Sequence, residues 1–136
     1  MTLCALYDMI DNRDDIELLT FSLPQTESIS MPIGDKCYIG IDYSKITSTA
    51  DEKEKIAHEL GHCVKGAFYN RHSKHDIISR HEYRADKWAC EQLVPRDELE
   101  EAFQQGYVEV WQLAEYFNVP ERLVKRAVWI YFDKVI

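Results

Sequence analysis

The chain has 136 residues, enough for one domain with a modest core, and its composition of 46% hydrophobic and 29% charged residues is ordinary for a globular protein. A formal net charge of −8 counts against a nucleic-acid partner, because the two would repel each other at long range. No apolar run approaches the roughly 18–20 residues that span a bilayer, and the N-terminus lacks a basic region followed by an apolar stretch. We therefore expect a cytoplasmic protein with no membrane segment.

The first third of the chain predicts one short helix followed by a small sheet. Apolar residues at positions 3, 6, 7 and 10 follow helical spacing, and the polar stretch DNRDD ends that helix. Residues 16–24 and 27–33 favour strands, and a turn at GDK leads into a third strand over 37–42. We predict a small antiparallel sheet in which 37–42 is an edge strand that holds an extended peptide.

The middle of the chain predicts two longer helices. Thr49 and Glu52 form a capping-box pattern at the start of the first helix, and Gly66 is a suitable left-handed stop. The polar loop NRHSKHD separates this helix from a second one over residues 79–94, which Pro95 ends.

The stretch EKIAHELGHCV, residues 54–64, places two histidines within the first of these helices. Residues four apart share a helix face, so His58 and His62 can present imidazole nitrogens to one metal ion. Glu59 comes directly after the first histidine, where it can act as general base on a metal-bound water without being a ligand. A helix that merely carries two surface histidines gives the same pattern, so the interpretation depends on a third ligand.

Glu82 lies twenty residues after His62 in the sequence HEYRAD, and Asp86 follows one helical turn later. Glu82 can complete a zinc site of two histidines and one glutamate, while Asp86 accepts the free N–H of a ligating histidine. A competing explanation is a capping box from Ser79 to Glu82, which leaves Asp86 without a role. The remaining candidates for the third ligand are Asp86 itself, His72, His75 and His81.

The motif HELGH followed by EYRADKWACEQLVP resembles the ImmA/IrrE family of metallopeptidases, a small gluzincin-type group. The second motif of this family has the form E-x-x-A-D/N-x-F-A-x-x-L-L-x-P. This chain matches it at Glu82, Ala85, Asp86, Ala89, Leu93 and Pro95. Trp88 replaces the usual phenylalanine, a change that touches no ligand. The resemblance is good over about residues 36–95 and looser beyond them.

The resemblance implies a zinc peptidase in which His58, His62 and Glu82 bind Zn2+ and Glu59 is the base. It also implies the substrate, a helix-turn-helix repressor from a phage or mobile element. The alternative, from a different class, is a non-catalytic, zinc-stabilised regulatory or docking module. The group that stabilises the oxyanion during hydrolysis stays open among a loop histidine, Tyr69 and Tyr83.

Residues 96–136 predict short helices, and the segment LAEYFNVPERLVKRAV has helix-turn-helix spacing that any two packed helices also give. Five basic and eight acidic residues make this region acidic, so we favour a structural or substrate-docking role over DNA reading. The predicted fold is α+β, with the sheet packed on the HExxH helix and the second ligand helix. Residues 1–95 are predicted to form the zinc peptidase core, and 96–136 a C-terminal helical extension packed on it as one structural unit.

Cysteine and tryptophan residues are predicted to belong to the core. The cysteines form no CxxC pair, which gives no sign of a disulfide framework or a cysteine zinc knuckle, so we expect small buried thiols at Cys4, Cys37, Cys63 and Cys90. Three tryptophans lie in apolar helical contexts and are expected to be buried, namely Trp88, Trp111 and Trp129.

Overall fold

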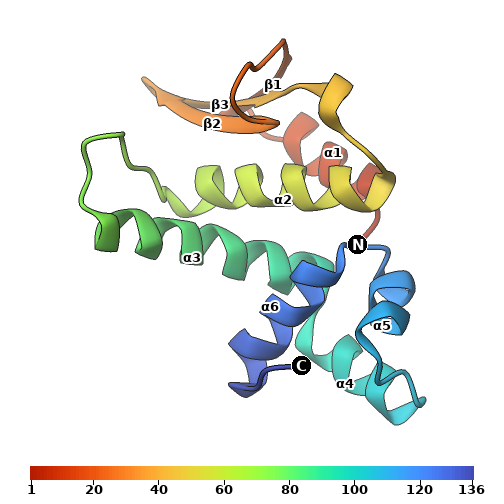
Figure 1. The fold of residues 1–136 in the computed structure, drawn as a ribbon. Coiled ribbons are helices and arrows are strands. Elements are labelled where there is room, and N and C mark those ends of the chain that lie inside the picture. Colours follow the sequence, from red (N-terminus) through yellow and green to blue (C-terminus); the bar gives the residue numbers. More distant parts are fainter.

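The computed structural model describes all of residues 1–136 and shows a small sheet lying on one side of a pair of long helices (Figure 1). The elements follow in the order α1 (Leu3–Asp11), β1 (Ile16–Thr20), β2 (Ser28–Ile33), β3 (Lys36–Ile41), a 3-10 turn (Tyr43–Lys45), α2 (Thr49–Lys65), α3 (His75–Leu93), α4 (Arg96–Gln104), α5 (Val110–Phe117) and α6 (Glu121–Phe132). The predicted α+β class is confirmed. None of the helices has both the length and the apolar composition that crossing a bilayer requires.

The sheet has the strand order β1-β3-β2, so β3 is its central strand and β2 is an edge. β1 pairs with β3 in parallel and β2 pairs with β3 antiparallel, which makes the sheet mixed instead of antiparallel as predicted. β3 is the most buried of the three strands, as suits a strand whose backbone is paired on both sides. The prediction of an edge strand over 37–42 is therefore wrong: β1 and β2 are the edges, and β2 is the edge strand that packs on α2.

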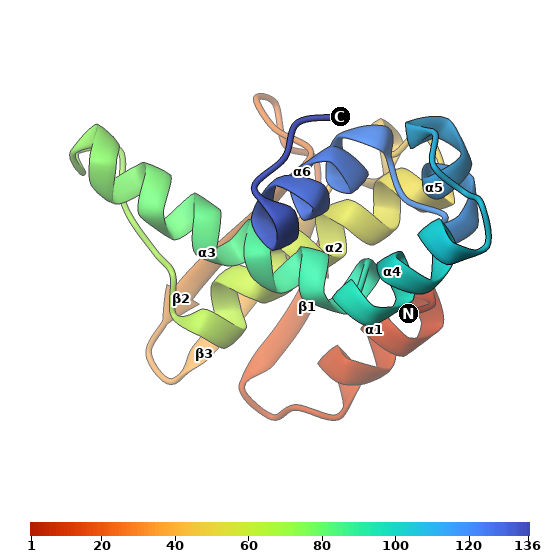
Figure 2. The same ribbon diagram turned by 90° about the horizontal axis from the view of Figure 1, so that it is seen from below.

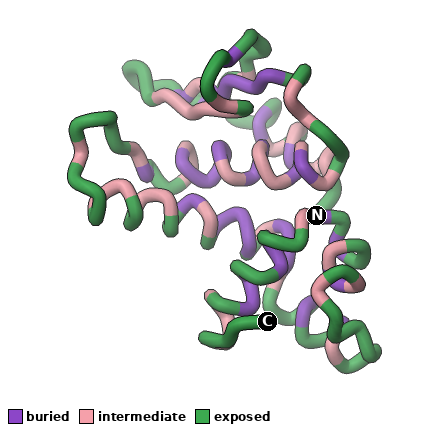
Figure 3. The backbone as a smooth tube through the Cα atoms, viewed as in Figure 1, coloured by how far each residue is buried: buried purple, intermediate pink, exposed green.

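Helix α2 lies between the sheet and α3, and local sequence defines its ends (Figures 1 and 3). Ser48 is the N-cap in place of the predicted Thr49, and its hydroxyl accepts a hydrogen bond from the N–H of Asp51. Gly66 ends the helix with a φ of 60°, a left-handed conformation that costs glycine little. Most residues in the middle of α2 are buried, and Ile56 and Leu60 are fully covered.

Helix α3 begins at His75, four residues before its predicted start. Asp76 lies in its first turn, where a negative charge interacts favourably with the helix dipole. Ser79 and Glu82 therefore lie inside the helix, and the capping box proposed for them does not form. This removes the competing explanation for Glu82.

Helices α4, α5 and α6 pack at one end of the α2–α3 pair, and α6 lies against α3 (Figure 2). Their buried residues join the same hydrophobic cluster as α2 and α3. Trp88 is buried as predicted, but Trp111 and Trp129 are 55% and 48% exposed. The prediction fails for these two because α5 and α6 bury one narrow stripe each, and both tryptophans lie outside it.

The pairing of the cysteines differs from the prediction, because the sheet packs on α2 and brings a cysteine of each element together. Cys37 of β3 and Cys63 of α2 form a disulfide, with their Cα atoms 5.8 Å apart. Cys90 is a buried free thiol and Cys4 is an exposed one. The prediction of buried, unpaired thiols is thus confirmed for Cys90 alone. The disulfide was missed because no spacing rule connects two residues 26 positions apart.

Candidate metal centre

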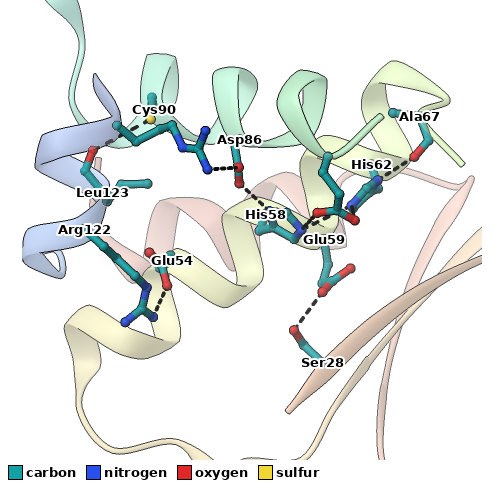
Figure 4. Close-up of polar contacts among 12 residues, drawn as sticks. Ser28, Glu54, His58, Glu59, His62, Ala67, Asp86, Cys90, Arg122 and Leu123 are labelled. Carbon is teal, nitrogen blue, oxygen red and sulfur yellow. Dashed lines mark hydrogen bonds and ion pairs between the residues drawn. The ribbon is translucent and has the colours of Figure 1, made fainter. Parts of the chain in front are cut away.

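The side chains of His58 and His62 in α2 meet that of Glu82, which reaches them from α3 (Figure 4). One ligand atom of each residue lies within 4.8 Å of those of the other two. The two histidine Nε2 atoms are 3.2 Å apart. The Glu82 carboxylate places one oxygen 2.9 Å from Nε2 of His58 and the other 3.3 Å from Nε2 of His62.

These distances fit a tetrahedral metal ion. At bond lengths of about 2.0–2.1 Å, two ligand atoms of a tetrahedral zinc lie about 3.3–3.4 Å apart. The separation of the two Nε2 atoms, 3.2 Å, is close to this value, and each Nε2 has one of the two Glu82 oxygens at 2.9 or 3.3 Å. Two imidazoles and a carboxylate are also a donor set that zinc accepts, so these residues can hold zinc without a large rearrangement.

Both imidazoles are oriented through their other nitrogen. Nδ1 of His62 lies 2.5 Å from the carbonyl oxygen of Ala67, and a carbonyl can only accept, so this nitrogen carries a proton. Nδ1 of His58 likewise donates to Oδ1 of Asp86 at 2.8 Å, the contact that the sequence predicted for Asp86. Both Nε2 atoms are therefore directed at one point, the arrangement that metal-ligating histidines require.

The electrostatics of the site favour a positive charge between the two Nε2 atoms and the Glu82 carboxylate. Burial lowers the pKa of His58, but hydrogen bonds to Asp86 and Glu82 outweigh it and raise that pKa to about 10. Burial likewise raises the pKa of Glu82, but hydrogen bonds from His58, His62 and Tyr69 hold it well below its usual range. A proton and a metal cation therefore compete for the same place.

Glu59 is buried on the side of α2 that faces the sheet. Its Oε2 accepts a hydrogen bond of 2.7 Å from the hydroxyl of Ser28, the first residue of β2 (Figure 4). Glu59 lines the same cavity as His58 and His62. Glu59 thus lies beside the two histidines, and a hydrogen bond from the edge strand fixes its orientation. A general base needs such a fixed position close to the proton that it takes.

The site opens into a cavity of about 380 Å³. Ser28, Ile29 and Ser30 of β2 form one wall, while Phe68 and Tyr69 lie in the segment that follows α2. A second hollow, of about 310 Å³, shares Ser28 and His58 with the first and is lined partly by α6. Polar and apolar groups together line a space of the size that binds small ligands or peptide side chains.

Of the residues considered for stabilising the oxyanion, Tyr69 is the one that lines this cavity. Its hydroxyl donates to Oε1 of Glu82 at 2.5 Å, and its ring lies between those of His62 and His81, with centroids 6.3 and 6.5 Å away. Burial and the contact with Glu82 raise the pKa of Tyr69 to about 12, so it is a hydrogen-bond donor at neutral pH. The remaining candidates line neither the cavity nor the metal cluster, namely His72, His75, His81 and Tyr83.

Gly61 has a structural role that the sequence analysis missed. A Cβ at this position would lie 2.7 Å from the carbonyl oxygen of Ala85 in α3, closer than packed atoms approach. The glycine of HELGH therefore allows α3 to approach α2 beside the histidines, which brings Glu82 and Asp86 within reach. A glycine inside a helix costs about 1 kcal/mol relative to alanine, and that cost was the available signal. Ser28 had no comparable signal, because only the fold places it beside Glu59.

Two helix-borne histidines, a glutamate from a second helix and a buried carboxylate beside them are typical of the zinc peptidase class. The family model Peptidase_M78, described as an IrrE N-terminal-like domain, matches residues 35–128. The chain belongs to this family, the ImmA/IrrE type of metallopeptidase, and the resemblance noted in its motifs is confirmed. No match was found among curated proteins or among solved structures.

Proposed function

We propose that this protein is a zinc-dependent endopeptidase that hydrolyses a peptide bond in a specific cytoplasmic protein. The observation that carries the proposal is the convergence of His58, His62 and Glu82 on one point, with Glu59 buried beside them. The family match supports the peptidase class. By resemblance to that family, we propose a helix-turn-helix repressor of a phage or mobile element as the substrate.

The residues of the chain have distinct roles in this hydrolysis. Zinc, when bound, polarises the peptide carbonyl and lowers the pKa of water towards about 7. Glu59 takes the proton of the attacking water and passes it to the leaving amine. Ser28 donates to Oε2 of Glu59, so Oε1, which accepts no hydrogen bond in the structure, is the oxygen proposed to accept that proton. Tyr69, on the wall of the cavity, donates to the oxyanion by turning its single hydroxyl proton away from Oε1 of Glu82.

The substrate is proposed to bind as an extended strand along β2. This strand is paired with β3 on one side only, so its other backbone groups can pair with a peptide, apart from the Ser28 carbonyl, which accepts from the Thr26 hydroxyl. Pro32 has no N–H to donate, so the usable stretch is 28–31, the part nearest Glu59. Proline replacements along a cleaved peptide should therefore reduce cleavage, and unchanged cleavage would contradict this binding mode.

The metal site is tested by elemental analysis of the purified wild type and Glu82→Ala. We expect about one zinc per wild-type chain, as in a catalytic site with three protein ligands, and a weakened or lost ion in the variant. Glu91→Ala is a matched control, because it removes an exposed carboxylate from the same helix. Wild type that holds no zinc after metal is supplied would contradict the proposal.

A non-catalytic docking module is the other function considered. It explains a bound zinc, but it gives no reason for a cavity over the metal centre or for a buried carboxylate beside the ligands. Proteolysis of a candidate repressor by the wild type, and none by Glu59→Gln with its zinc retained, would exclude it. A cellular effect that survives Glu59→Gln would instead favour the module.

A further inference from the structure

Asp86 is shared between the metal centre and the C-terminal helix. Its Oδ1 accepts the hydrogen bond from Nδ1 of His58 at 2.8 Å, and its Oδ2 lies 3.3 Å from Nη2 of Arg126 in α6. We propose that Arg126 is a positioning residue of the metal centre, which holds Asp86 in the orientation that aligns His58. The inference rests on the proposed zinc site and adds to it a residue outside both sequence motifs.

The geometry around Asp86 explains why a second partner matters. An aspartate side chain rotates about two bonds, so a single hydrogen bond to one oxygen does not define the plane of its carboxylate. His58 and Arg126 are its two polar partners, one on each oxygen. Its side chain is only 24% exposed, so water competes weakly with these contacts. The guanidinium therefore determines which oxygen faces the imidazole.

Helix α6 is held in a position to do this by contacts with both ligand helices. Arg122, one turn before Arg126, forms an ion pair with Glu54 of α2 (Figure 4). At the other end of α6, the hydroxyl of Tyr131 donates to the carbonyl of Val94, which directly follows α3, at 2.8 Å. Thus α6 bridges α2 and α3 on the side of the metal centre where Asp86 lies.

Helix α6, the second helix of the segment with helix-turn-helix spacing, carries a basic cluster of Arg122, Lys125 and Arg126, and the same contacts give this cluster a function. Arg122 and Arg126 are paired with acidic groups of α2 and α3, whereas Lys125 forms no ion pair. Two of the three charges that a recognition helix would offer to DNA are therefore used inside the molecule. Lys125 is also a suitable control, since it is an exposed cation adjacent to Arg126 in the sequence that lacks the contact with Asp86.

The test is a zinc titration of the full chain against a competing chelator. Removing a direct partner of a metal-ligating histidine typically weakens metal binding 10–100-fold. Arg126 acts one step further away, so we expect Arg126→Gln to weaken zinc binding about three- to tenfold. Arg126→Lys should recover most of the loss, and Lys125→Gln should bind zinc like the wild type. Equal zinc affinity in Arg126→Gln and the wild type would overturn the inference.

A double-mutant cycle separates positioning from a general structural effect. If Arg126 acts through Asp86, Arg126→Gln should cause no further loss of zinc affinity in a chain that already carries Asp86→Asn. Additive losses would overturn the inference. If Arg126→Gln does not fold, Arg126→Met, which keeps the apolar stem, takes its place and the same outcomes decide. If the wild type itself binds no zinc, the proposed function is contradicted. If the wild type and Arg126→Gln bind zinc equally well, only the inference about Arg126 fails, so the titration distinguishes the two outcomes.

Discussion

The α2–α3 pair and the C-terminal group α4–α6 contribute to the metal centre in different ways. The pair carries the histidines and carboxylates within two short motifs, whereas α4–α6 carry no comparable motif. Yet Arg126 of α6 contacts Asp86, and the buried Lys53 of α2 donates to the carbonyl of Phe117 at the end of α5, at 2.8 Å. The comparison shows that a few positions carry the chemistry, while a larger part of the chain maintains their orientation.

Glu59→Gln, a change within the α2–α3 pair, should have the largest effect on the rate of hydrolysis. The amide keeps the shape of the side chain but cannot accept the proton, so hydrolysis should slow about 10²–10⁴-fold. Zinc content and thermal stability should stay close to those of the wild type. Cleavage of a candidate repressor, followed by mass spectrometry, measures the rate, with Glu91→Gln as a control. Normal cleavage by Glu59→Gln would exclude its assigned role.

Leu60→Ala and Leu113→Ala compare the cores of the two regions. Both leucines are fully buried and belong to one hydrophobic cluster, so each replacement should lower the free energy of unfolding by about 2–5 kcal/mol. Because the cluster is continuous, both variants should unfold in a single transition, as monitored by circular dichroism and tryptophan fluorescence in urea. A separate, earlier transition in Leu113→Ala would instead make α4–α6 an independent unit.

Tyr69→Phe tests the part of the cavity wall that the segment after α2 provides. The variant removes the proposed donor to the oxyanion, so the rate of hydrolysis should fall about 10²-fold, at the low end for such groups because Tyr69 is 41% exposed. Because the hydroxyl also donates to the ligand Glu82, zinc affinity should fall as well, so the rates are compared with zinc at saturation. Tyr83→Phe on α3 should leave the rate unchanged. Equal rates for the two variants would remove Tyr69 from the mechanism.

Gly61→Ala tests the close approach of α2 and α3. Helix propensity alone would stabilise this variant by about 1 kcal/mol, but the added methyl group meets the backbone of Ala85, and overpacking costs about 1–3 kcal/mol. We therefore expect a net loss of stability together with weaker zinc binding. Gly66→Ala provides the comparison, because its Cβ meets no neighbour and only its left-handed φ is strained. A more stable Gly61→Ala with full zinc affinity would show that the contact is unimportant.

Arg122→Gln should have the smallest effect on stability. Its partner Glu54 lies on α2, but the arginine side chain is 63% exposed, and exposed ion pairs contribute less than about 1 kcal/mol. The variant should therefore unfold close to the wild-type midpoint in urea. A loss well above 1 kcal/mol would show that α6 depends on this pair for its attachment, which would make the C-terminal group more fragile than its core suggests.

Most of the fold and the members of the candidate site were predictable, because they depend on short-range patterns. The α+β class and the long helices follow from apolar periodicity and helix-stop residues. The predictions failed for the start of α3, the edge strand, the pairing of Cys37 with Cys63 and the exposure of Trp111 and Trp129. Each failure concerns contacts between segments distant in sequence, or helix ends where several residues compete.

The sequence by itself determined which side chains are available to bind a metal. His58 and His62 share a helix face whatever surrounds them, because four residues make about one helical turn. Only the tertiary structure decided how these side chains are held. The approach of α3 at Gly61, the contact of Ser28 with Glu59 and the reach of Arg126 to Asp86 join residues that are 24 to 40 positions apart. No local period encodes such contacts, since they arise from the packing of whole elements against one another.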